Sequence, residues 1–141
     1  MATATEQLQV VELAREFARE KIEPFAAEWD RTRHFPRDVI DEMGKLGFLG
    51  MCAPEEYDGM GLDALTYIMA LEEIAAADAS IAVSMGIHNA IPTTMLVKHG
   101  APAQKERWLR PMARGEMLAG FALSEADAGS DPASLRAQAV R

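Results

Sequence analysis

Apolar residues recur at helical spacing along most of the chain. From Glu6 to Trp29 they fall on one face of a helix, but Pro24 interrupts the run. Proline lacks an N–H and its ring meets the carbonyl four residues back, so we expect the helix to kink or restart there. A second helix is indicated at Pro36, which suits a first turn, and Gly47 ends it.

Capping residues predict two further helices. Asp63 is a good N-cap for a third helix, and Asp78 or Ser80 can cap a fourth. Pro92 forces a bend in the fourth helix. A short helix follows, and two residues then bring the helical part to an end: Pro111 and Gly115.

The pattern changes after Gly115, because apolar residues alternate with period two over residues 117–123 and again over residues 135–141. One or two strands cannot form a stable sheet by themselves. We therefore predict a mainly α fold, with a helical bundle over residues 1–116. The first one or two strands of an incomplete β-domain would follow over residues 117–141.

Charge and composition exclude several classes of function. The 141 residues include 14 Lys and Arg against 22 Asp and Glu, a net charge of −8, so no nucleic-acid surface is expected. Mean hydropathy is −0.08, and no apolar run reaches the roughly eighteen residues of a membrane span. Cys52 is the only cysteine, and the chain starts with neither a secretory signal nor a transit peptide, which together indicate a cytoplasmic protein.

The spacing of the histidine, serine and acidic residues along the chain gives little indication of a catalytic site. No pair among His34, His88 and His99 has the spacing of a metal site, and we interpret His88 as a structural histidine. Ser124 and Glu125 are adjacent on a turn and have no histidine beside them, so they cannot act as nucleophile and base. A hydrolase is therefore disfavoured.

Residues 121–131, FALSEADAGSD, are the exception because several features converge there. Ser124 offers a hydroxyl to a planar polar edge such as that of a flavin. Gly129 lets backbone N–H groups approach a phosphate without a Cβ in the way. A solvated Asp/Ser turn is the alternative, and the residues alone leave both interpretations open.

This stretch resembles the signature of the acyl-CoA dehydrogenases, an aromatic-x-hydrophobic-Thr/Ser-Glu-Pro-x-Ala-Gly-Ser-Asp run that opens their middle β-domain. Residues 54–63 also resemble the family's proline-glutamate, glycine-rich loop, and the likeness extends over almost the whole chain. Two positions depart from the signature: Ala126 stands at the usual proline, and Ser124 replaces the commoner threonine but keeps the hydroxyl.

The resemblance implies an enzyme that oxidises an acyl-CoA thioester between Cα and Cβ. A hydride passes to FAD, a glutamate takes the α-proton, and electron-transfer flavoprotein usually reoxidises the flavin. The family forms homotetramers. Its catalytic glutamate lies in a C-terminal helical domain that this sequence does not contain, so no catalytic residue is expected here and the chain alone should be inactive.

The resemblance also assigns binding roles by position. Ser130 would lie beside both the pyrophosphate of FAD and the thioester arm of the substrate. Ile87 and Ile91, one helical turn apart, would line the acyl pocket, so their bulk would affect the chain length accepted. The positions expected to bind FAD are Phe121, Leu123, Ser124, Gly129 and Ser130.

Two other functions fit the same residues. An acyl-CoA oxidase or a related flavin monooxygenase shares this region but lets oxygen reach the reduced flavin. A stand-alone helical interaction domain without catalysis would instead bind a partner through an exposed apolar face.

Overall fold

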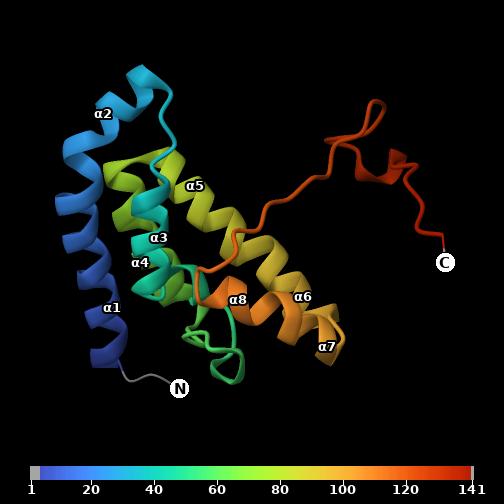
Figure 1. The fold of residues 1–141 in the computed structure, drawn as a ribbon, viewed down its shortest axis with the longest axis horizontal. Helices are drawn as coiled ribbons and strands as arrows, with labels where there is room; N and C mark the ends of the chain where they lie inside the picture. The colour runs from blue at the N-terminus through green and yellow to red at the C-terminus, as the bar shows by residue number, and fades with distance from the viewer. Residues whose placement is uncertain (1–3, 141) are drawn as a thin grey trace.

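Helices make up most of the chain before Gly115 in the computed structural model, which describes residues 4–140 (Figure 1). The predicted α-helical fold class is confirmed. Three short 3₁₀ turns cover Phe48–Gly50, Glu55–Tyr57 and Pro132–Ser134. The α-helices are α1 (Ala4–Phe17), α2 (Glu23–Thr32), α3 (Arg37–Lys45), α4 (Ala64–Ala77), α5 (Ala79–His88), α6 (Thr94–His99), α7 (Pro102–Gln104) and α8 (Arg110–Ala113).

Three π-helical segments join consecutive α-helices, and each lies beside a proline. They cover Ala18–Ile22 before Pro24, Asn89–Thr93 around Pro92, and Lys105–Leu109 before Pro111. Proline cannot donate to the carbonyl four residues back, so the regular α-helical ladder breaks there. The predicted interruptions at Pro24 and Pro92 are confirmed. The prediction that Pro111 helps to end the helical part was wrong, because Pro111 lies inside α8.

The predicted caps form as expected. Asp63 accepts a hydrogen bond from the Thr66 N–H at 2.8 Å and begins α4. Asp78 accepts from the N–H groups of Ser80 and Ile81 at 2.7 and 3.0 Å and begins α5. Each carboxylate thereby satisfies donors that a helix N-terminus leaves without a partner.

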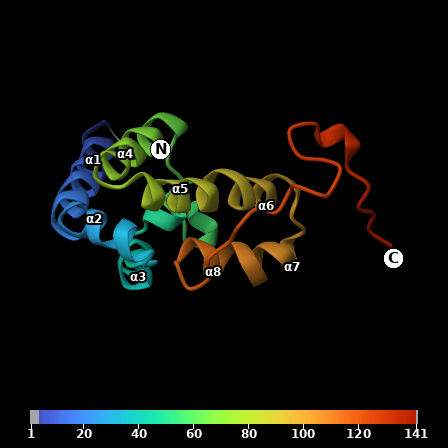
Figure 2. The ribbon, with the colours of Figure 1, turned by 90° about the horizontal axis from the view of Figure 1, so that it is seen from above.

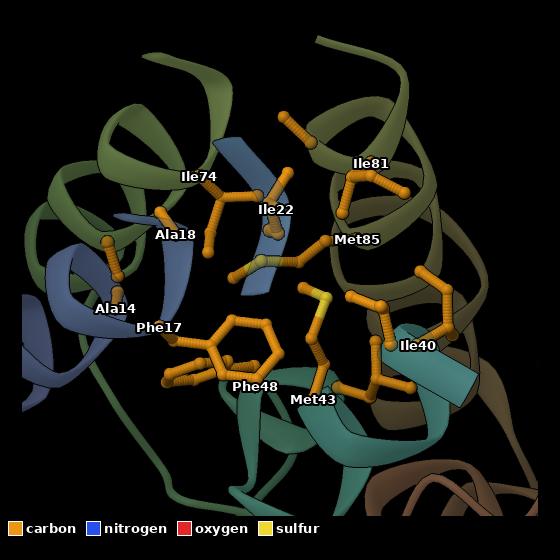
Figure 3. Packing of buried hydrophobic residues seen from close by; sticks show 14 of the residues in the cluster. Ala14, Phe17, Ala18, Ile22, Ile40, Met43, Phe48, Ile74, Ile81 and Met85 are labelled. Carbon is orange, nitrogen blue, oxygen red and sulfur yellow. The ribbon is translucent and has the colours of Figure 1, made fainter. Parts of the chain in front are cut away.

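The hydrophobic core lies where α1, α4 and α5 pack around α3 and the turn after it (Figure 3). The rings of Phe17 and Phe48 meet edge to face, with centroids 5.7 Å apart. Met43 and Met85 are fully buried beside them. Flexible thioethers fill irregular gaps between helices, which accounts for part of the chain's high methionine content.

The loop before α4 is held by backbone hydrogen bonds. Met60 and Gly61 donate to the carbonyls of Gly50 and Ala53, both at 2.9 Å. Gly59 lies so close to Ala53 that a Cβ would come within 2.1 Å of its carbonyl oxygen, so only glycine fits. The loop is thus a rigid part of the helical domain.

After Gly115, whose φ is +73°, the chain leaves the helices as an extended segment (Figures 1 and 2). Between residues 116 and 140, the only β-type backbone pairing is an isolated bridge between Glu125 and Ala128. The sequence predicted strands over 117–123 and 135–141, but residues 4–140 contain no β-strand. An extended backbone becomes a strand only when another strand pairs with it, and none lies beside it here.

Candidate functional site

The extended segment crosses the end of α5 and encloses a cavity of about 230 Å³ against it. Ile87 faces this cavity together with His88, so the structure brings one predicted acyl-pocket residue beside the segment that leads to the signature. The cavity is lined by Phe35, Ile40, Leu49, Ser84, Ile87, His88, Leu118, Ala119 and Gly120.

A second, more open cavity of about 470 Å³ lies further along the same segment. Phe121 lines it together with Pro92 and Met95. Ile91 is half-buried one turn after Ile87 and is not among the residues that line either cavity. The structure therefore brings Ile87 beside the extended segment.

The signature residues form a compact turn. The Glu125 N–H donates to the Ala128 carbonyl at 2.8 Å, and the Ala128 N–H donates back to Glu125 at 3.3 Å. The Glu125 carboxylate accepts from the backbone N–H groups of Arg136 and Ala137 at 2.8 and 3.0 Å. The side chain of one signature residue thus folds the following segment back onto the turn.

Ser124 and Gly129 face each other across this turn, because a Cβ on Gly129 would lie 3.5 Å from the Ser124 hydroxyl. Phe121, Leu123, Ser124 and Ser130 are exposed. Hydroxyl groups beside exposed apolar side chains suit a ligand that is planar, apolar on its faces and polar at its edges. The side chains present are compatible with a flavin.

Two buried polar residues at the end of α5 hold the surrounding segments together. Asn89 donates to the carbonyls of Phe48 and Met85 at 2.8 and 3.2 Å and accepts from the Cys52 N–H at 3.3 Å. Nδ1 of His88 accepts from the Ala119 N–H at 3.2 Å, and its Nε2 lies 3.2 Å from the Met112 carbonyl.

His88 is 1% exposed and is held as a neutral imidazole. Because Nδ1 accepts, Nε2 must carry the proton and donate to Met112. Burial lowers the pKa of His88 below 6.5, although the backbone carbonyls of Met112 and Leu49 act in the opposite direction. Both ring nitrogens therefore have a partner only in the neutral form.

Sequence reasoning missed the roles of His88 and Glu125. The sequence led to the interpretation of His88 as a structural histidine, without naming what it holds, and Glu125 was considered only as a base. Their backbone partners lie 31 and 11 residues away, and a hydrogen bond to a backbone N–H leaves no mark on the residue that donates it. The adjacent His88 and Asn89 in an apolar helix were the available signal.

Burial raises the pKa of Cys52 to about 11, so the thiol stays protonated at neutral pH. Across residues 4–140, no three His, Cys, Asp or Glu side chains gather as metal ligands. Within the same residues, no helix is both long and apolar enough to cross a membrane.

The architecture is a helical domain that continues into an extended segment bearing the signature turn. The family model for the N-terminal domain of acyl-CoA dehydrogenases matches residues 4–116. The chain therefore belongs to the acyl-CoA dehydrogenase family.

Individual relatives agree. An acyl-CoA dehydrogenase of Bacillus subtilis (strain 168) is 36% identical over all of this chain and 37% of its own length. Butyryl-CoA dehydrogenase from Megasphaera elsdenii matches at a TM-score of 0.89 and 32% identity, over 96% of this chain and 36% of that one. A structure reported for the electron transferring flavoprotein of Acidaminococcus fermentans matches at 0.89 and 35% identity, over 95% and 35%. The chain spans little more than a third of these relatives.

Proposed function

We propose that this chain is the N-terminal part of an FAD-dependent acyl-CoA dehydrogenase, which oxidises acyl-CoA thioesters to 2,3-enoyl-CoA. One observation carries the proposal. The signature FALSEADAGSD forms an exposed turn, and the segment that leads to it is anchored to the helical domain beside Ile87. A solvated turn alone would not require such an anchor.

FAD, when bound, accepts the hydride. Phe121 and Leu123 would contact the flavin ring, and the Ser124 hydroxyl would donate to its polar edge. Gly129 and Ser130 would lie beside the pyrophosphate, where a residue without a Cβ allows close approach of the backbone. The exposure of these side chains and the pairing of Ser124 with Gly129 support this assignment.

The substrate would enter between the same elements. Ser130 would also contact the thioester arm of CoA, and Ile87 and Ile91 would line the acyl pocket. Ile87 already faces a largely apolar cavity, and branched residues there would limit the acyl chains accepted. Ile91 lies one turn further along the same helix and is half-buried.

The glutamate that takes the α-proton, and most of the contacts that hold FAD, would come from the rest of the protein. Residues 1–141 alone would therefore be inactive.

We further propose electron-transfer flavoprotein as the electron acceptor and a homotetramer as the assembled form. We also propose a cytoplasmic location, because Cys52 is the only cysteine in the sequence and a reducing compartment suits a chain without disulfides. The domain boundary would fall between residues 116 and 117, just after the turn at Gly115.

A stand-alone interaction domain is the second candidate, and one surface favours it. An apolar groove of about 410 Å³ runs between α4 and α5, and Val83 beside it is 58% exposed. Exposed apolar surface of this kind suits contact with another protein. The two candidates differ in one measurable property, because only the dehydrogenase requires FAD.

Replacing Ser130 tests the site. In the protein expressed from its complete reading frame, Ser130→Tyr should weaken FAD or acyl-CoA binding by about tenfold or more, because a bulky side chain would stand at the pyrophosphate and thioester. The measurements are the flavin-to-protein ratio and an acyl-CoA titration.

Ala139→Tyr, at an exposed position further along the same segment, is the control and should leave both values near those of the wild type. Unchanged flavin content and unchanged acyl-CoA affinity in Ser130→Tyr would remove Ser130 from the site.

A further inference from the structure

The direction of the extended segment is fixed just after it leaves the helices. The Met117 N–H still donates to the Pro111 carbonyl at 3.2 Å. The next bond that ties the segment to the helical body runs from the Ala119 N–H to Nδ1 of His88, also at 3.2 Å. The signature begins two residues later, at Phe121.

Leu118, Ala119 and Gly120 line the cavity against the end of α5, and Gly120 and Phe121 line the next cavity along the segment. In extended chain, a slip by one residue would move each of them to the neighbouring position and turn its side chain the other way. The bond at Ala119 therefore fixes the register in which the segment, with Phe121 two residues on, follows the helical body. His88 itself cannot move easily, because its ring is buried and its Nε2 donates to Met112 at the end of α8.

We propose that His88 is a positioning residue that sets the register of the signature segment through the hydrogen bond that its Nδ1 accepts from Ala119. This inference rests on the proposed function in one respect, because the positioned segment would bind a flavin only if the protein is a flavoenzyme. The two hydrogen bonds of the ring stand independently of that function.

Substitution of His88 by asparagine or by glutamine tests the two hydrogen bonds of the imidazole ring one at a time. The side-chain oxygen of asparagine falls near the position of Nδ1, so His88→Asn can still accept from Ala119 but loses the donor to Met112. The side-chain nitrogen of glutamine falls near Nε2, so His88→Gln can still donate to Met112 but loses the acceptor for Ala119. Both variants are neutral and smaller than histidine, which makes each a control for the other.

The experiment compares both variants with the wild type in the protein expressed from its complete reading frame. Hydrogen exchange of the peptide that contains residues 117–123 should be about tenfold faster in His88→Gln, as expected for the loss of one hydrogen bond, and close to the wild type in His88→Asn. Flavin content should follow the same order, with His88→Gln the lower of the two.

Equal behaviour of the two variants, or a larger effect in His88→Asn, would overturn the proposal, because His88 would then act only by packing or through Met112. A wild type without flavin would defeat the proposed function, while the exchange comparison would still decide the role of His88. If neither variant folds, ¹⁵N NMR of the wild-type histidines decides: the proposal requires His88 to be protonated on Nε2, and a proton on Nδ1 would refute it.

Discussion

Two neighbouring residues, His88 and Asn89, are among the few polar side chains in an otherwise apolar interior. Every polar atom of the two side chains has a hydrogen-bond partner, and no buried side-chain nitrogen or oxygen in the described part of the chain lacks one. Buried polar groups stabilise a fold only when they are satisfied in this way. Asn89 bonds to the turn after α3. His88 joins the last turn of α8, at Met112, to the beginning of the extended segment, at Ala119.

The neutral state of His88 predicts a pH dependence at the residue scale. Because the pKa is below 6.5 in the folded chain, the unfolded chain binds more protons as the pH falls below that value. The stability that His88 contributes should be complete above pH 6.5 and should be lost as the pH falls through the lowered pKa. Denaturant unfolding between pH 7.5 and pH 5 measures it.

The His88→Asn variant is the control, because asparagine does not titrate. Its free energy of unfolding should depend less on pH than that of the wild type over the same range. Identical slopes in the two proteins would mean that His88 is not held neutral by the fold.

At the scale of single elements, prolines shape the helices without ending them. Pro92 removes the N–H that would have bonded to the carbonyl of His88 in an α-helix, and the π-helical turn brings the N–H of Thr93, five residues on, to that carbonyl in its place. The hydroxyl of Thr93 donates to the same carbonyl at 2.7 Å. Thr93 is 1% exposed, so water cannot take over this bond. One residue thereby compensates for the change that the proline makes.

This compensation can be measured with a double-mutant cycle. Thr93→Val removes the hydroxyl hydrogen bond to the buried carbonyl of His88 and should cost about 0.5–1.5 kcal/mol of unfolding free energy. In a Pro92→Ala background the new N–H can donate to that carbonyl, so Thr93→Val should cost less than it does beside Pro92. Denaturant unfolding of the four proteins gives the coupling. Additive effects would show that Thr93 does not compensate for Pro92.

Sequence reasoning succeeded where the determinants are local. Asp63 and Asp78 cap helices through N–H groups within three residues, and Pro24 and Pro92 act on their own turn. Prediction from the sequence failed where the structure depends on residues far away in the sequence or on a second strand to pair with. The alternating pattern over residues 117–123 correctly indicated extended backbone, but pairing needs a second strand that the pattern cannot supply.

The same division holds for the candidate site. The signature was recognisable because its residues are consecutive. The anchor at His88 and the fold of the turn around Glu125 depend on backbone N–H donors elsewhere in the chain. Every residue except proline has such a donor, so the sequence does not show which one is used. Of the two predicted acyl-pocket residues, Ile87 lines a cavity together with the extended segment, and the role of Ile91 stays a prediction.

At the scale of the whole molecule, the chain is a helical domain with a signature segment that extends away from it (Figure 1). It spans 37% of a Bacillus subtilis relative, and the proposed chemistry needs groups from outside this third. The helical domain would then supply one wall of the acyl pocket and fix where the flavin-binding segment begins.

The most direct test is the visible absorption spectrum of the protein expressed from its complete reading frame, recorded without oxygen before and after the addition of acyl-CoA. Short, branched and long acyl chains would be tried in turn. We expect bound oxidised flavin whose absorption at least one acyl-CoA bleaches, with slow recovery in air. Rapid recovery would indicate an oxidase. A protein without flavin, or with flavin that no acyl-CoA reduces, would contradict the proposed function.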